Sequence, residues 1–315
     1  MKRVSTIVRL RDLREALEIF VGSLVAWFVP ERHWDAIVRF YVANLVKRRP
    51  PHVERRMLKV AQLFGDRYDS EGGRDIVADH DRHRQRSHLQ RFKELSPFGW
   101  HPSIRVRGEA HVAAALADGN GAILWVGRFA HSDVVTKKGL HQLGLRVSHL
   151  SRPEHAFVDS WFAKRVLSPI WLVPESRYLA ERIVYRKGHP TPMAKRIYQC
   201  LTENQIVSIT SGPESLQRMD VPFLGCRLRI ATGPANLAIM TGAPLLPVFT
   251  VRNEAGGFEV NVEPPLTVPD GADRRTSLQA MAAEFAERQG AMACKYPAQF
   301  KFYLGAVLMP HEYDH

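Results

Sequence analysis

The chain has 315 residues, of which 45% are hydrophobic, so it can bury a sizeable core and a disordered chain is not expected. Its 44 Lys and Arg residues against 32 Asp and Glu give a net charge of +12, which favours an anionic partner: a phospholipid surface, a nucleic acid or an acidic carrier protein. The 3 cysteines form no C-x-x-C pair, which argues against a zinc site or a disulfide framework and for a reducing, cytosolic compartment.

The first apolar segment runs from Leu17 to Pro30, and its uninterrupted apolar core is shorter than the roughly 20 residues of a membrane-spanning helix. It carries two large aromatic residues, Phe20 and Trp27. It is preceded by basic residues: Lys2, Arg3, Arg9, Arg11 and Arg14. This pattern predicts a helix over about residues 14–30 that lies in an anionic membrane interface, with a core helix of a soluble domain as the alternative. Charges near the start argue against a cleavable secretory signal.

From residue 14 to about 92 the apolar residues recur at spacings of three and four, which predicts a set of antiparallel helices broken by Pro30, Pro50 and Gly72. The stretch "DHDRHRQRSHLQRF" over 79–92 holds several histidines among arginines. We interpret it as a solvated basic face that meets lipid phosphate or water. A metal site is the alternative, but no carboxylate or cysteine completes a ligand set at zinc spacing, so no metal is expected.

After residue 100 strands and helices alternate. "IRVRG", "AILWVG", "LRVSHLSRP", "QIVSIT", "PLLPVFTVRN" and "FEVNVEPPL" are typical of strands, and the segments 109–121, 131–144, 190–204, 233–243 and 277–296 of helices. The alternation predicts an α/β fold, a sheet with helices on both faces. We therefore expect a helical amino-terminal region over 1–99 and an α/β domain over 100–315.

Several motifs, in order and spacing, resemble those of the lipid A late acyltransferases, the lauroyl and myristoyl transferases of the lysophospholipid acyltransferase superfamily. They are "IRVRGEAHVAAALADGNGAILWVG", "VSHLSRP", "LTENQIVSITSGPES", "VPFLGCRLRIATGPANLAIMTGAPLLPVF", "FEVNVEPPL" and "YPAQF". None of these motifs is specific alone, but their order and spacing are hard to obtain by chance, and "VPFLGCRLRIATGPANLAIMTGAPLLPVF" is the closest match. The resemblance implies the fold of the glycerolipid acyltransferases, with a central mixed sheet flanked by helices.

The resemblance also implies an activity. Such enzymes move a fatty acyl chain from acyl carrier protein or coenzyme A to a hydroxyl of a lipid or glycolipid acceptor, in lipid A and lipopolysaccharide biosynthesis. No resident cofactor is implied. The location implied is the cytoplasmic face of the bacterial inner membrane, with peripheral or single-anchor attachment. A basic surface suits an acidic carrier and an anionic acceptor. No nucleic-acid recognition motif is present, so no nucleic-acid partner is expected.

The family's catalytic motif is a histidine, four residues, then Asp or Glu, in which the histidine serves as general base. If Asp133 takes the acid position, the histidine position holds Arg128, whose guanidinium cannot accept a proton at neutral pH. If His131 takes the histidine position, Thr136 stands where the acid belongs. Three residues are therefore candidates for the catalytic site: His131, Asp133 and Arg128.

Two hypotheses follow for this loop. In the first, His131 acts in catalysis with Asp133, and Arg128 modifies the site, because His131 is the nearby side chain whose ordinary pKa suits a base. In the second, Arg128 and Asp133 form a structural ion pair in a homologue of weak or lost activity that binds lipid or acyl chains. We expect the loop to adjoin an apolar channel for the acyl chain.

Four further residues are predicted to bind substrate. Arg152 matches the family's Arg-Pro, and Glu214 lies where the family has an aspartate. Arg227 and Arg229 follow the F-x-G motif and are expected to contact acceptor phosphate or the carrier. The alternatives are an ordinary exposed arginine for Arg152, a polar turn for Glu214, and a solvated strand charge for one of Arg227 and Arg229.

Overall fold

The computed structural model describes residues 7–48, 50–151, 160–185, 190–211, 217–269, 271–301 and 307–308. Its centre is a sheet of seven strands in the order β1-β9-β8-β2-β5-β3-β4. Their bounds are β1 Ile104–Arg107, β2 Ala122–Val126, β3 Val147–Ser151, β4 Glu181–Val184, β5 Ile206–Thr210, β8 Leu245–Arg252 and β9 Phe258–Val262. β2, β3, β4, β5 and β8 run parallel, whereas β9 is antiparallel to β8 and parallel to β1. The mixed sheet expected from the family resemblance is thus confirmed.

Strand β2 shows why the sheet is covered on both faces. All five of its residues are buried. Ile123 and Trp125 belong to a core shared with α8, α9 and α10, and Trp125 stacks on Phe285 with ring centroids 4.1 Å apart. Leu124 and Val126 belong to a second core with α5 and α6. Because successive side chains of a strand point to opposite faces, a fully apolar strand must be covered twice.

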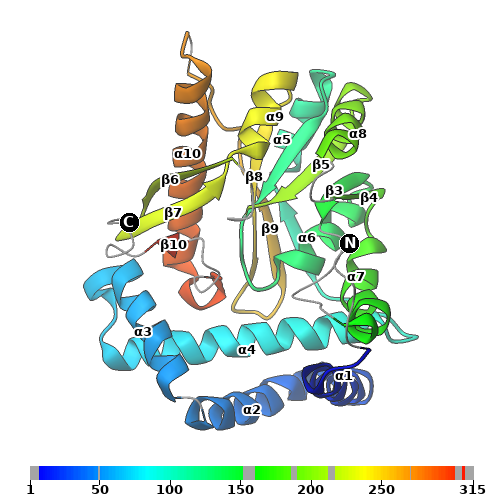
Figure 1. Cartoon of the computed structure of the whole chain (residues 1–315), viewed down its shortest axis with the longest axis vertical. Helices are drawn as coiled ribbons and strands as arrows, with labels where there is room; N and C mark the ends of the chain where they lie inside the picture. The colour runs from blue at the N-terminus through cyan, green and yellow to red at the C-terminus, as the bar shows by residue number, and fades with distance from the viewer. Residues whose placement is uncertain are drawn as a thin grey trace.

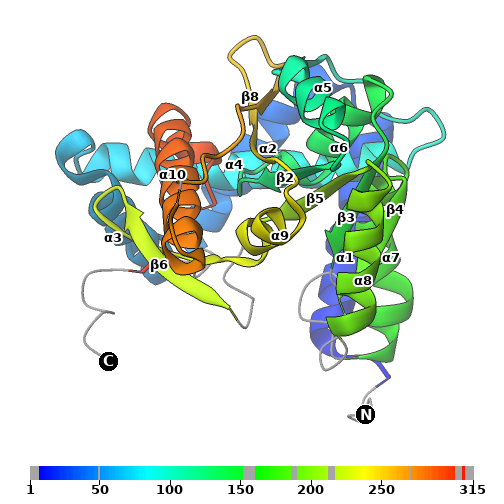
Figure 2. The same ribbon diagram turned by 90° about the horizontal axis from the view of Figure 1, so that it is seen from above.

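The covering helices follow the predicted alternation. They are α5 Glu109–Ala117, α6 Ser132–Gln142, α8 Pro190–Thr202, α9 Gly233–Thr241 and α10 Arg274–Lys295. Another helix, α7 Ser168–Ser176, follows a short π-helical segment, η3 Ala163–Leu167, and was not predicted. Figure 2 shows α7 and α8 at one end of the molecule and α10 toward the other.

A second, smaller antiparallel sheet was also not predicted. It has the order β10-β7-β6, with β6 Arg218–Phe223, β7 Cys226–Ala231 and β10 Val307–Leu308. A tight turn joins β6 to β7: Leu224 has a φ of 51°, and a Cβ on Gly225 would lie 2.4 Å from the Gln62 carbonyl oxygen of α3. β6 lies beside α10 (Figure 2), so this sheet extends the core at that end of the molecule.

Four helices precede the sheet: α1 Leu10–Phe28, α2 Trp34–Arg48, α3 Pro50–Phe64 and α4 Ser70–Glu94. Short 3-10 turns also occur, at η1 Glu31–His33, η2 Gly65–Arg67 and η4 Pro297–Gln299. Helix α4 begins at Asp69, whose side chain accepts a hydrogen bond of 2.7 Å from Gly72 N. It runs across one end of the sheet, and α1 and α2 lie on its far side (Figure 1).

Helix α1 exposes large apolar side chains. Leu17 and Phe20 are both 61% exposed, and Phe28 is 75% exposed. The neighbouring helix α2 adds Phe40, which is also 75% exposed. Among the described residues, no helix has both the length and the apolar character to cross a bilayer. Exposed apolar side chains that cluster are typical of surfaces that contact a membrane or another protein.

Candidate functional site

The turn between β2 and α6, residues 127–131, is fixed by its backbone. Gly127 N donates to Val248 O at 2.8 Å, Ala130 N donates to Gln299 O at 2.8 Å, and Lys301 N donates to Arg128 O at 3.0 Å. A Cβ on Gly127 would lie 2.5 Å from the Phe249 ring, so glycine lets the turn pack directly on β8. The turn is therefore held between β8 and the segment that follows α10, at the carboxyl edge of the parallel strands where α/β folds place their sites.

Asp133 lies in the first turn of α6 and is shared by two cations. Its Oδ2 atom is 3.3 Å from Arg91 Nη2 and 3.3 Å from Lys301 Nζ. Burial alone would raise the pKa of this carboxyl, but the charges of Lys301, Arg91 and Lys137 outweigh burial and lower the pKa to about 2. Asp133 is therefore an anion at neutral pH and pairs with both cations through its charge.

His131 lies beneath the turn and is only 2% exposed. Its Nδ1 is 3.0 Å from Gln90 Oε1 and its Nε2 is 3.0 Å from His83 Nδ1. The amide oxygen can only accept, so Nδ1 of His131 carries the proton and Nε2 accepts from His83. Burial, followed by nearby cationic groups, lowers the pKa of His131 well below its usual value. Both ring nitrogens are thus engaged with helix α4, and no hydrogen bond joins His131 to Asp133 in the described part of the chain.

Arg128 is partly buried in the same turn. Among the described residues Asp133 pairs with Arg91 and Lys301, and no ion pair of Asp133 with Arg128, which one sequence hypothesis expected, is found there. The tertiary fold explains this, because Arg91 of α4 and Lys301 of the segment after α10 reach the Asp133 carboxylate. Sequence spacing gives no sign of either.

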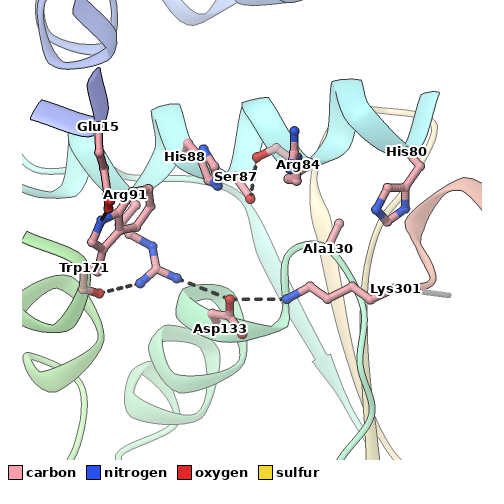
Figure 3. Close-up of a pocket in the computed structure, with 10 residues that line it drawn as sticks. All are labelled: Glu15, His80, Arg84, Ser87, His88, Arg91, Ala130, Asp133, Trp171 and Lys301. Carbon is pink, nitrogen blue, oxygen red and sulfur yellow. Dashed lines mark hydrogen bonds and ion pairs between the residues drawn. The ribbon is translucent and has the colours of Figure 1, made fainter. Parts of the chain in front are cut away.

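A cavity of about 290 Å³ opens beside Asp133 (Figure 3). Its lining residues are Glu15, His80, Arg84, Ser87, His88, Arg91, Ala130, Asp133, Trp171 and Lys301. In Figure 3, Arg91 and Lys301 reach Asp133 from different elements, α4 and the chain after η4. Most of the side chains that line this cavity are charged or polar, so it differs from the apolar channel expected beside the turn.

The interpretation of residues 79–92 as a solvated basic face is wrong. Along this stretch of α4, His80 is 1% exposed, Gln90 3% and Arg91 4%. Arg91 Nη1 donates to the Trp171 carbonyl and lies 2.6 Å from Glu175 Oε1. A helix with polar residues all round carries no apolar stripe, so periodicity could not show which polar face is buried.

Two of the described histidines line the cavity. His80 Nδ1 lies 3.0 Å from the Ala298 carbonyl oxygen, which fixes its ring between α4 and η4. His88 contacts the Trp171 ring edge to face, with centroids 4.9 Å apart, and makes no hydrogen bond with any described residue. Burial, and then the charges of Arg84, Arg91 and Lys301, lowers the pKa of His88 to about 3. His88 is therefore a neutral imidazole whose nitrogens are available to a ligand in the cavity.

Of the four predicted substrate-binding residues, only Arg227 and Arg229 are described, and neither lines this cavity. Arg152 and Glu214 lie outside the described residues. Arg227 and Arg229 lie on β7 and do not line the cavity. Arg229 holds Asp220 through two contacts of 2.9 Å, from Nε to Oδ1 and from Nη2 to Oδ2, while Arg227 Nη2 donates to Asp220 O. Their roles toward substrate remain predictions.

No group of three or more histidine, cysteine, aspartate or glutamate side chains is arranged to hold a metal ion in the part of the chain that is described. His80 and His83 both lie on α4, but their nearest partners are protein groups: the Ala298 carbonyl for His80 and the His131 ring for His83.

The family of this chain follows from its similarity to known proteins. The family model of bacterial lipid A biosynthesis acyltransferases matches residues 19–299. The chain belongs to this family. It is also similar to the phosphatidylinositol mannoside acyltransferase of Mycobacterium tuberculosis, in strains CDC 1551 / Oshkosh and ATCC 25618 / H37Rv, with 26% identity over 183 residues, or 58% of this chain. Since the match spans 54% of each relative, the chain spans about half the length of the curated relatives it matches.

Membership in the lipid A biosynthesis acyltransferase family confirms the resemblance found in the motifs. The sequence motifs pointed to Asp133 as a candidate but not to three other residues of the cavity wall: His88, Arg91 and Lys301. His88 and Arg91 stood in the histidine- and arginine-rich stretch 79–92, whose unusual composition was the available signal. Lys301 directly follows "YPAQF", the last family motif, and had no signal of its own.

Proposed function

We propose that this acyltransferase-family protein moves a fatty acyl chain from a thioester, carried by acyl carrier protein or coenzyme A, to a hydroxyl of an anionic lipid or glycolipid at a membrane surface. The observation that carries the proposal is the cavity beside the β2–α6 turn. There Asp133, at the acid position of the family motif, shares the walls with the neutral imidazole of His88.

The chemistry needs a proton acceptor, and His88 is the candidate. His131 has both nitrogens engaged with α4, and the Asp133 carboxylate is held by Arg91 and Lys301, whereas His88 makes no hydrogen bond with a described residue. Burial, and then the charges of Arg84, Arg91 and Lys301, lowers the pKa of His88 to about 3, so an anionic substrate bound in the cavity would raise this pKa and strengthen His88 as a base. In the proposed step the acceptor hydroxyl attacks the thioester carbonyl carbon while a His88 nitrogen takes its proton. The tetrahedral intermediate collapses to the ester, the C–S bond breaks, and the imidazolium returns the proton to the thiolate.

The same cavity supplies groups for the developing oxyanion. Asp133 holds two cations beside the cavity, Arg91 and Lys301, and Lys301 keeps N–H donors for the oxyanion. Donors fixed in place before reaction stabilise charge that develops in the transition state. In this proposal Asp133 is a positioning residue for the two cations, and His131 is a positioning residue that fixes α4 against the turn.

Helix α1 links the cavity to a membrane surface. Glu15 lines the cavity and accepts a hydrogen bond of 3.1 Å from Trp171 Nε1. Leu13, Leu17 and Phe20 of the same helix are more than half exposed, at 55%, 61% and 61%. A helix with exposed apolar side chains and flanking arginines can lie in an anionic interface. We propose that α1 attaches the protein at the cytoplasmic face of the inner membrane and presents lipid acceptors to the cavity.

The test is transfer of radiolabelled palmitate from palmitoyl-carrier protein and from palmitoyl-coenzyme A to vesicles of a bacterial total lipid extract. Wild type should form labelled lipid, and His88→Ala should lose about 10²- to 10⁴-fold in rate, the usual contribution of a general base. The control is His101→Ala, because His101 is an exposed histidine bonded to the Phe98 carbonyl. No labelled lipid with either donor would refute the proposed function, and a fully active His88→Ala would refute the assigned proton acceptor.

One observation favours the second candidate function, a homologue of weak or lost activity that binds lipid or acyl chains. Arg128 stands at the position of the family histidine, and it cannot serve as a base. Under this alternative the cavity binds an acceptor without turnover. Binding of the lipid extract together with absent transfer would support it.

A further inference from the structure

Lys301 has binding capacity left after its contact with Asp133. Its ammonium group carries three N–H donors. In the described structure its side chain has one partner, Asp133 Oδ2, at 3.3 Å. That contact is longer than the roughly 2.7–2.9 Å of a strong charge-assisted hydrogen bond. The side chain is 17% exposed and lines the cavity, so its other donors can meet a ligand there.

Arg84 is the second cation of the cavity wall whose N–H groups can still bind a ligand. Its ion pair is a contact of 3.7 Å from Nε to Asp81 Oδ1, and Asp81 is held more closely by Arg56 at 2.8 Å. The Arg84 side chain is 40% exposed. Arg91 differs, because its two terminal nitrogens already contact Glu175, Asp133 and the Trp171 carbonyl. Arg84 and Lys301 are thus the cavity cations that can still bind an anion.

The size and lining of the cavity limit the class of ligand that it can bind. A volume of about 290 Å³ is at the lower end of the roughly 300–1,000 Å³ of small-molecule sites. It suits a phosphate with a few adjoining carbons and is small for a whole lipid. His88 adds a neutral N–H donor or acceptor beside the two cations. The lining side chains include three cations, Arg84, Arg91 and Lys301, against two carboxylates, Glu15 and Asp133, so the wall carries a net positive charge and matches a phosphate ester better than a hydrocarbon chain.

We propose that this cavity is a phosphate subsite in which Lys301 and Arg84 bind the phosphate group of the acyl acceptor and hold its hydroxyl near His88. The proposal rests on the proposed function for the identity of the acceptor, but phosphate binding is measured without turnover. A bound phosphate also offsets the charges of Arg84 and Lys301, which favours proton uptake by His88. Acceptors with a phosphate near the reacting hydroxyl are therefore the substrate class.

The experiment measures binding to the full chain at constant ionic strength, with chloride as the reference anion. The probes are inorganic phosphate, glycerol 3-phosphate, and phosphatidylcholine vesicles with or without phosphatidic acid. The signal is the fluorescence of Trp171, taken as the difference between wild type and Trp171→Phe, because Trp171 lines the cavity. Calorimetry with the two soluble probes gives the affinity independently.

We expect saturable binding that weakens about ten- to a hundredfold in Lys301→Met and in Arg84→Gln, the usual effect of losing a charged hydrogen bond. Lys301→Arg should retain this binding, so weaker binding by Lys301→Met would report the loss of the charge and not the loss of the fold. The matched control is Lys195→Met, which removes one charge from the exposed surface of α8.

The outcomes separate the two proposals. Binding of the soluble probes alone supports the subsite and assigns it to a soluble phosphate ester. Stronger binding to vesicles that contain phosphatidic acid, if Lys301→Met abolishes it, supports the subsite and assigns the phosphate to a lipid. Absence of saturable binding with every probe, or equal binding by wild type and Lys301→Met, would overturn the subsite while leaving acyl transfer to be judged by its own assay. Phosphate binding without any acyl transfer would overturn the proposed function alone.

Discussion

Substitution of His131 by alanine distinguishes a positioning residue from a proton acceptor. The ring is 2% exposed and makes two hydrogen bonds of 3.0 Å, to Gln90 and to His83. Each hydrogen bond contributes about 0.5–1.5 kcal/mol, and a buried partner left unsatisfied costs about 1–3 kcal/mol. The expected loss in the free energy of unfolding is therefore about 2–4 kcal/mol.

The assay combines guanidinium denaturation with the rate of acyl transfer, measured at a temperature where the variant is folded. Because His131 does not line the cavity, we expect the rate to fall by less than the about 10²- to 10⁴-fold that loss of a general base produces. His149→Ala is the matched control: His149 is also buried, but its ring bonds Ser208 Oγ at 2.8 Å in the sheet. A variant of His131 with wild-type stability and a rate reduced more than a hundredfold would refute the positioning role.

Three further results are expected. Burial lowers the pKa of His83 to about 4 and of His88 and His149 to about 3, so the unfolded chain takes up protons first below about pH 6.5. The free energy of unfolding should then fall by up to about 1.4 kcal/mol per pH unit for each of these histidines, and denaturant titrations that give equal stability at pH 7.5 and pH 5 would contradict this. Arg128→His should leave the acyl transfer rate flat or lower it, because the cavity is built by other residues, whereas a gain in rate would favour the homologue of lost activity. Phe20→Ser should reduce sedimentation with anionic vesicles without lowering the thermal midpoint, since Phe20 is 61% exposed, and unchanged sedimentation would argue against α1 as the membrane contact.

The contacts of Asp133 show how far sequence reasoning reaches at this site. Its two cations come from positions 42 residues before and 168 residues after it in the chain. Arg91 arrives because α4 crosses the end of the sheet, and Lys301 because the segment after α10 pairs with the turn at Arg128. Local spacing, which suggested Arg128 or His131 as partners, carries no information about such distant segments.

The amino-acid sequence by itself determined the α/β alternation, the doubly covered strand β2, the acyltransferase family and the place of Asp133 at the start of α6. These features depend on local periodicity and motif order, since burying an apolar face requires a repeat that can be counted along the chain. The tertiary structure decided which polar side chains surround Asp133, that His131 is enclosed by α4, and that His88 lines the cavity. The physical reason is that polar residues are buried only when distant partners satisfy them, and those partners are set by the packing of α4 across the sheet.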